Sequence, residues 1–170
     1  MRELRPGLWH WEAPHPQWEA TEPWSENVSS YAIDDGERLL LFDPLAVPSE
    51  LGDLAAGRET AIVLTAPWHE RDAQSLVERL GVPVYTPLPD AAQDLMDMYG
   101  VTAEQAGDGS PDLVWLLRLE INESWLRPGV TREAIAARLR PLLELPVEHV
   151  LATHGGPSDR AALERALSAS

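Results

Sequence analysis

A small set of residues with chemically useful side chains follows directly on apolar stretches of the sequence. They are Asp43 after residues 39–42, then Trp68, His69, Glu70, Arg71 and Asp72 after residues 61–64, and His154 after residues 149–153. In open α/β sheets, ligands gather outside the carboxyl ends of the strands. If the three apolar stretches are neighbouring strands, we expect these residues to converge on one rim.

The types and spacing of these residues suit a metal-dependent hydrolase. His69 and Asp72 stand three residues apart, which places them on one face of a helix. His154 would supply a third ligand for zinc or another divalent metal. Glu70 or Asp43 would then serve as the general base that takes a proton from water. This hypothesis predicts a single mononuclear site.

Each of these residues also has a structural interpretation, which stays open at this point. Asp72 at a helix N-terminus favours the helix dipole, and Glu70 and Arg71 would be exposed charges of the first turn. His154 precedes two glycines and would be a hydrogen-bonded structural histidine. Asp43 would orient a loop through its backbone amides, which is the role we favour for it.

The charge balance and the lack of cysteine exclude several classes of function. The 170-residue chain has 13 basic and 28 acidic residues, for a net charge of −15. Nucleic acids and anionic membrane surfaces are not expected as partners, because both attract basic side chains. Without cysteine there are no disulfides, thiolate zinc sites or cysteine nucleophile. The N-terminus lacks the apolar segment of a signal peptide, so we predict a cytoplasmic protein.

The hydrophobic pattern predicts an α/β protein with one domain over residues 1–170. Strands at residues 28–33 and 38–43 are joined by a turn at Asp35-Gly36, and another apolar strand follows at 61–64. A helix after it has apolar side chains spaced three and four residues apart, and Gly81 ends it. The next strand, at residues 82–85, makes a right-handed parallel crossover.

Capping residues and apolar runs predict the other elements. Helices are expected at residues 49–56, 90–99 and 131–144, with a bend near Pro141, and from Ser158 or Asp159 to Leu167. A capping box on Thr102 and Gln105 predicts one more short helix. Strands are expected at residues 113–118 and 149–153.

Tryptophan is concentrated near the N-terminus, where four of the seven lie within the first 24 residues. Trp9 and Trp11 alternate with polar residues, as in a half-buried strand. We expect these rings to pack over the core. Two alternatives stay open, namely a cluster that stacks on a ligand and the apolar patch of an acidic protein-interaction module.

Taken in order, these elements resemble the metallo-β-lactamase-fold hydrolases. The resemblance is carried by an opening hairpin, Leu41-Phe42-Asp43-Pro44, a short helix, Ile62-Val63-Leu64-Thr65, a strand–helix–strand unit and a closing Leu151-Ala152-Thr153-His154-Gly155. It covers residues 5–105 and 130–168. It implies an αββα sandwich with mixed sheets, of which the second half is shortened in this chain.

The metal-binding motif of that family is changed here. In the family, the strand that matches residues 61–64 is followed by His-X-His-X-Asp-His, which supplies most ligands for one or two zinc ions. The four ligand positions fall on Ala66, Trp68, Glu70 and Arg71, and only His154 matches the last ligand. A catalytic zinc has three protein ligands plus a reactive water. A cation at Arg71 would also repel a dication by several kcal/mol, even at an effective dielectric of about 20.

The resemblance therefore implies a degenerate metal site, with no metal or cofactor expected. We predict a non-catalytic protein or a small-ligand binder whose binding edge carries Trp68, His69, Arg71 and His154. A shortened second half would leave an apolar edge exposed, and a homodimer would cover it. The substrate or ligand is not specified, because one fold hosts many chemistries.

Overall fold

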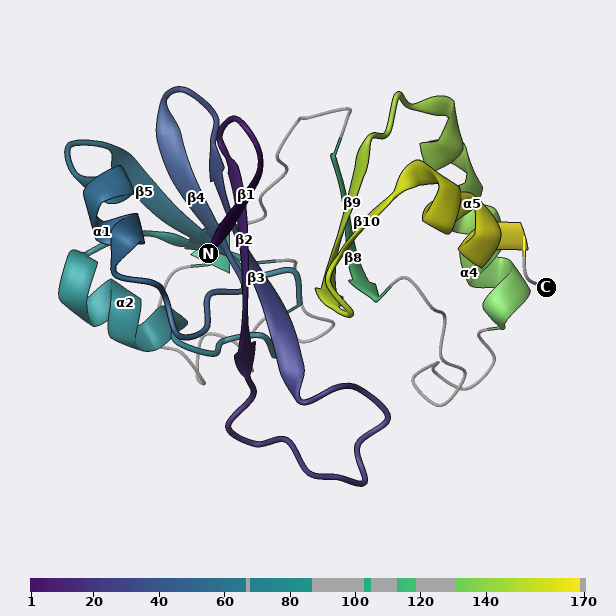
Figure 1. Ribbon diagram of the computed structural model, residues 1–170, viewed down its shortest axis with the longest axis horizontal. Helices are drawn as coiled ribbons and strands as arrows, with labels where there is room; N and C mark the ends of the chain where they lie inside the picture. Colours follow the sequence, from purple (N-terminus) through teal and green to yellow (C-terminus); the bar gives the residue numbers. More distant parts are fainter. Residues whose placement is uncertain (67, 87–102, 105–112, 119–130, 169–170) are drawn as a thin grey trace. The chain divides into compact units, whose positions relative to one another are not determined.

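The computed structural model describes residues 1–66, 68–86, 103–104, 113–118 and 131–168 (Figure 1). The chain forms two compact units, Met1–Asp108 and Gly109–Ser170. Each unit has a β-sheet of its own. That the two units together make a single domain stays a prediction.

The first unit is built on a seven-stranded mixed sheet whose strands keep their order along the chain. From β1 to β4, each strand pairs antiparallel with the next one, and from β4 to β7 each strand pairs parallel with the next one. The hairpin predicted at Asp35-Gly36 is confirmed. The strands are β1 (Arg2–Arg5), β2 (Leu8–Pro14), β3 (Asn27–Asp34), β4 (Arg38–Phe42), β5 (Glu59–Val63), β6 (Val84–Tyr85) and β7 (Ala103–Glu104).

The apolar run of β4 explains its central place in this sheet. Leu39 and Leu41 point to one face, where they pack in a buried cluster with Leu51, Ile62 and Leu76. The residues that alternate with them, 40 and 42, are also buried. A strand buried on both faces is apolar throughout rather than alternating, which is the pattern seen in the sequence.

Two helices, α1 (Glu50–Ala55) and α2 (Ala73–Leu80), lie on the face of the sheet that carries Leu41 (Figure 1). Gly81 ends α2 in the left-handed conformation, with φ of 66°, and its N–H donates to the carbonyl of Val77 at 2.8 Å. The predicted helix end and the parallel β5–α2–β6 crossover are therefore confirmed. Ser49 precedes α1 as expected, but its side chain caps no backbone N–H.

The second unit contains a three-stranded sheet in the order β10-β9-β8, with β8 parallel and β10 antiparallel to β9. Thr131 caps α4 and Asp159 caps α5, each by accepting a backbone N–H. The α4 helix passes into a 3₁₀ turn next to Pro141, where the bend is predicted. The elements are β8 (Leu113–Arg118), α4 (Arg132–Leu139), η2 (Arg140–Glu144), β9 (His149–His154), β10 (Pro157–Asp159) and α5 (Arg160–Ser168).

Two expectations about these elements are wrong. The capping box on Thr102 predicts a helix, but Ala103–Glu104 is the strand β7, because pairing with β6 outweighs the local preference. In addition, β9 belongs to the second sheet, so the strands that precede Asp43, Trp68 and His154 are not three neighbours. The helix predicted at residues 90–99 lies outside the described residues. In the described part of the chain, no helix combines the length and the apolar character needed to cross a membrane.

The α2 helix provides a test of the core. Leu76→Ala is expected to lower the free energy of unfolding by about 2–5 kcal/mol, because a buried leucine leaves a cavity when it is truncated. Leu76 is 1% exposed, whereas Leu80, one turn later, is 47% exposed. Leu80→Ala is the matched control and should change stability by less than about 1 kcal/mol. Urea unfolding followed by circular dichroism measures both, and equal losses would contradict this assignment of the buried face.

Candidate functional site

The carboxyl ends of β4 and β5 form the edge that carries most of the predicted site. The two strands are parallel, with Phe42 opposite Val63, so the residues that follow them emerge side by side. The Asp43 N–H donates to the carbonyl of Val63 at 3.0 Å, which extends the pairing by one step. The loops that begin at Asp43 and Thr65 therefore face each other across this edge.

Asp43 is the centre of a buried hydrogen-bond network. Its Oδ1 accepts the backbone N–H of Thr65 at 2.8 Å, and its Oδ2 accepts the Thr65 hydroxyl. The Nδ1 atom of His69 lies 3.0 Å from the same Oδ2 and 3.1 Å from Thr65 Oγ1. Because an ionised carboxylate can only accept a hydrogen bond, His69 carries the hydrogen on Nδ1 and donates it to Asp43.

The environment of Asp43 favours its charged form. Asp43 is 1% exposed and His69 is 6% exposed. Burial alone raises the pKa of a carboxyl, but the hydrogen bond and charge of His69, the charge of Arg71 and the Thr65 hydroxyl lower it. The net result is a pKa for Asp43 below its ordinary value. A carboxylate that holds its charge this firmly suits a structural role better than that of a general base.

Arg71 ties the same edge to the neighbouring strand β3. One guanidinium nitrogen donates to the carbonyls of Ser29 at 2.8 Å and of Asp43 at 2.6 Å. The Ser30 hydroxyl donates to the same Asp43 carbonyl at 2.7 Å and accepts the N–H of Leu45 at 3.1 Å. Burial lowers the pKa of Arg71, whereas the negative charge of Asp43 raises it. The guanidinium remains a cation, fixed among backbone carbonyls.

The two loops are also held in an unusual backbone conformation. In the described part of the chain, three non-glycine residues have positive φ, and all three lie here: Asp43 at 43°, Ala46 at 48° and Arg71 at 47°. Asp72 links the loops, since its Oδ2 accepts the Ala46 N–H at 2.6 Å and its own N–H donates to the Pro44 carbonyl. Left-handed backbone costs about 1–2 kcal/mol per residue. Such strain persists where surrounding contacts impose it, and it is concentrated at functional sites.

These contacts correct two predictions about the segment. The α2 helix begins at Ala73, so His69 and Asp72 do not share a helix face, and Asp72 instead binds the facing loop. Arg71 is not an exposed first-turn charge, because it is half-buried and its guanidinium donates to the backbone carbonyls of Ser29 and Asp43. The expectation that Asp43 orients a loop through backbone amides is confirmed by its bond to Thr65. His154 ends β9 in the second unit, opposite Arg118 of β8.

Trp68 and Glu70 are the predicted site residues that face outward. The indole of Trp68 is 69% exposed, and its ring stands edge-on to His69 with centroids 6.3 Å apart. Glu70 is half-buried, and burial raises the pKa of its carboxyl. Of the two bases proposed from the sequence, Glu70 therefore has the environment that better suits proton transfer.

Two residues of the site, Ser30 and His15, are missed by the sequence pattern, and Thr65 lies in the predicted segment without a predicted role. The sequence did offer a signal for Ser30, since two consecutive serines stand inside the apolar strand β3 and buried hydroxyl groups need hydrogen-bond partners. His15 lies close enough to this edge for its pKa to be lowered, first by burial and then by the charges of Arg71 and His69. Its ring packs edge-on against Trp24, 5.2 Å away.

The N-terminal tryptophans whose contacts the structure describes pack and donate within the first unit. Trp11 is buried in the core, and its indole N–H donates to the Leu45 carbonyl at 2.8 Å. Trp18 donates in the same way to the carbonyl of Trp24. Trp11 thereby holds the loop that follows Asp43 in place. The expected packing role of these rings is confirmed for Trp11.

The donor set does not fit the zinc site implied by the resemblance. Within the described residues there is no group of three or more His, Asp or Glu side chains placed to hold a metal ion. The first two ligand positions are a buried alanine, Ala66, and an exposed indole, Trp68. The position of the last motif histidine is the cation Arg71, which is bound to backbone oxygens.

Comparison with known proteins identifies the fold. No family model and no curated protein matches the sequence. Among solved structures, DIM-1 metallo-β-lactamase exposed to ceftazidime matches with a TM-score of 0.65 at 12% identity, covering 98% of this chain and 94% of that one. A metallo-β-lactamase from Erythrobacter litoralis with β-mercaptoethanol in its active site matches with a TM-score of 0.64 at 13% identity, covering 98% and 93%.

An NDM/FIM-1-like enzyme from Erythrobacter litoralis, in a mono-zinc form, matches with a TM-score of 0.59 at 14% identity, covering 98% and 94%. Identities this low show the fold alone. They confirm the prediction of an α/β protein with the metallo-β-lactamase-like αββα architecture and mixed sheets.

The buried network around Asp43 provides a test of this site. Asp43→Asn is expected to lower the free energy of unfolding at pH 7 by about 3–5 kcal/mol, because it leaves buried charged partners uncompensated. Asp35→Asn, at the exposed ion pair with Arg38, is the control and should lose less than about 1 kcal/mol. Urea unfolding measures both variants.

The pH dependence of stability in the wild type and in Asp43→Asn tests whether Asp43 is charged in the folded chain. Because its pKa is lower in the folded than in the unfolded chain, the carboxylate stabilises the fold fully above the unfolded pKa of about 3.9. That contribution is lost as the pH falls through the folded pKa. The stability difference between wild type and Asp43→Asn should therefore shrink as the pH falls below about 4. A difference that stays constant down to acidic pH would show that Asp43 is not held as a carboxylate.

Proposed function

We propose that this chain, which has the metallo-β-lactamase fold, carries a degenerate metal site and acts as a non-catalytic protein that binds a small ligand at the Asp43–His69 edge. The observation that carries the proposal is the place of Arg71. Its guanidinium donates to the backbone carbonyls of Asp43 and Ser29, and its charge acts on the Asp43 carboxylate that contacts His69. A fixed cation there disfavours a second positive charge.

The aspartates of the edge also have hydrogen-bond partners within it, although the buried Nε of Arg71 has none. Both oxygens of Asp43 accept hydrogen bonds, and Asp72 accepts the Ala46 N–H. A metal ion at Nδ1 of His69 would displace the bond with Asp43 and leave a buried carboxylate without that partner, so Nδ1 is not available to a metal. These contacts support a site whose two aspartates already have hydrogen-bond partners without a metal.

The groups left for a ligand are Trp68 and Glu70. The exposed indole offers a face for stacking, and the half-buried carboxyl of Glu70 makes no hydrogen bond or ion pair with the described residues. An aromatic face beside a carboxyl favours a planar or cationic small molecule. We therefore expect a ligand of this kind rather than an anion, since one guanidinium nitrogen of Arg71 already donates to two backbone carbonyls.

The competing hypothesis is a mononuclear metal-dependent hydrolase that uses His69, Asp72 and His154. His69 and Asp72 do lie in one loop, but the Asp72 carboxylate is bonded to the facing loop. That hypothesis requires His69 to bind the metal through Nε2, with Nδ1–H kept on Asp43, and Asp72 to bind through Oδ1, since its Oδ2 accepts the Ala46 N–H. It predicts one tightly bound divalent ion per chain.

Metal loading separates the two hypotheses. Purified protein incubated with excess zinc, iron or manganese and then dialysed is expected to retain far less than one equivalent, because the ligand positions are Ala66, Trp68 and Arg71. Elemental analysis measures the metal content. A zinc metallo-β-lactamase carried through the same steps is the positive control.

The outcome that contradicts the proposal is one equivalent of retained metal together with hydrolysis that a chelator abolishes. In that case Asp72→Asn would be the decisive variant, since the competing hypothesis makes Asp72 a ligand. Loss of the metal from that variant would assign the site to the loop before α2.

A further inference from the structure

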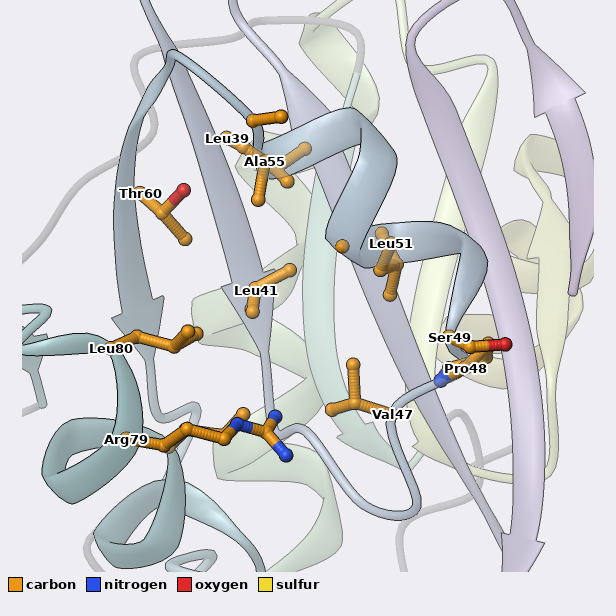
Figure 2. Close-up of a pocket in the computed structure, with 13 residues that line it drawn as sticks. Leu39, Leu41, Val47, Pro48, Ser49, Leu51, Ala55, Thr60, Arg79 and Leu80 are labelled. Carbon is orange, nitrogen blue, oxygen red and sulfur yellow. The ribbon is translucent and has the colours of Figure 1, made fainter.

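His10 is a buried titratable side chain that the proposed function does not use. It stands on β2 between Trp9 and Trp11, which pack with the core cluster on the face of the sheet that α1 and α2 cover. Leu39 and Leu41 lie on that same face (Figure 2). Because side chains alternate along a strand, His10 lies on the opposite face, where it is 8% exposed.

The contacts of the His10 ring suit a neutral imidazole. Its Nε2 atom lies 3.0 Å from the Ser29 hydroxyl, and its ring packs against that of Tyr31 with centroids 5.0 Å apart. Both partners belong to β3, and both are 1% exposed. Among the described residues, the carboxylate that acts on the ring is that of Glu12, which is exposed and lies 3.8 Å from Nε2. A buried imidazolium would therefore have little compensation for its loss of water.

The edge strand β1 brings positive charge to the same histidine. Arg2 is the register partner of His10, so the two side chains stand opposite each other on one face of the sheet. Burial lowers the pKa of His10 most, the charge of Glu12 raises it, and the charges of Arg2 and of the Met1 amino group lower it further. The net result is a pKa for His10 below its ordinary value, which keeps the ring neutral at pH 7.

The strand β1 is also the strand of this sheet that can leave His10 at the least cost. It has four residues at the edge of the sheet, its register with β2 shifts between Glu3 and Arg5, and its side chains are exposed or half-buried. By contrast, β3 pairs with all seven residues of β2 and with β4 on its other side. Short, exposed segments open locally at a lower free energy than core strands do.

We propose that His10 is a pH sensor whose protonation releases β1 and exposes the edge of β2. Once β1 has left, the ring is closer to water and away from Arg2, so the open form takes up a proton more readily than the closed form does. The pairing of β1 is therefore strongest above about pH 6.5 and weakens as the pH falls below that value. The freed backbone groups of β2 are then available to another strand.

Such a switch is independent of the proposed function, because none of the side chains that contact His10 belongs to the Asp43–His69 edge. The two also differ in pH range. The switch acts between about pH 7 and pH 5, whereas the lowered pKa of Asp43 keeps that carboxylate charged until the pH falls below about 4.

Amide hydrogen exchange of the full chain tests the release of β1. The opening equilibrium of residues 2–5, taken from exchange rates corrected for the intrinsic effect of pH, is expected to rise at least about threefold from pH 7 to pH 5. The upper limit is about thirtyfold, because a histidine in water has a pKa of about 6.5. Residues 31–33, in the middle strand β3, should keep their protection over the same range.

Two histidine variants assign the effect to His10. In His10→Gln, the carboxamide can still bond to the Ser29 hydroxyl but does not titrate, so the opening equilibrium should change by less than about 1.5-fold over this range. His15→Gln is the matched control, since the pKa of His15 is also lowered but this residue lies in the loop after β2. It should keep the wild-type response, and circular dichroism checks that both variants fold.

An NMR titration of the His10 ring in the wild type makes the test independent of the variants. The pKa measured for the ring should lie below about 6.5. A pH sensor at His10 is ruled out by a pKa at or above that value, by exchange of residues 2–5 that does not respond to pH, by an equal response in His10→Gln, or by a loss of protection across the whole sheet. Each of these results would leave the proposed function of the Asp43–His69 edge untouched.

Discussion

The buried carboxylate of Asp43 is the constraint on which the rest of this edge depends. A charge that is 1% exposed is stable only when hydrogen bonds and an opposite charge compensate its loss of water. Thr65 and His69 supply the hydrogen bonds, and Arg71 brings the positive charge to the backbone of the same residue. Each partner comes from the loop after β5, so the network also fixes that loop against the end of β4.

The same constraint explains the backbone strain and the place of the N-terminal strand. Asp43, Ala46 and Arg71 adopt left-handed conformations because the network and the Asp72–Ala46 bond require these loop paths. Trp11 completes the arrangement by binding the Leu45 carbonyl from β2. Strands β2 to β5 and the two loops are thus linked by hydrogen bonds to Asp43 or to its neighbours. A substitution of Asp43 is therefore expected to destabilise the packing of these strands as well as the loops.

This arrangement shows how a fold can be kept while the chemistry at its edge is changed. The metallo-β-lactamase fold brings two parallel strand ends together and leaves polar side chains facing each other there. In this chain those side chains bind one another, and the guanidinium of Arg71 donates to the backbone beside them.

The sequence by itself determined the hairpin, the strands β4 and β5 and the helix α2, since apolar periodicity and Gly81 reflect local geometry and burial, but it did not predict the strand β7. It also placed Asp43 and His69 after strands of the first sheet, and it showed that the His-X-His-X-Asp-His motif is absent. Only the tertiary structure decided that His69 pairs with the Asp43 carboxylate and that Arg71 donates to the Asp43 backbone carbonyl. Those contacts join residues 26 and 28 positions apart. They depend on strand register and loop path, which no local pattern specifies.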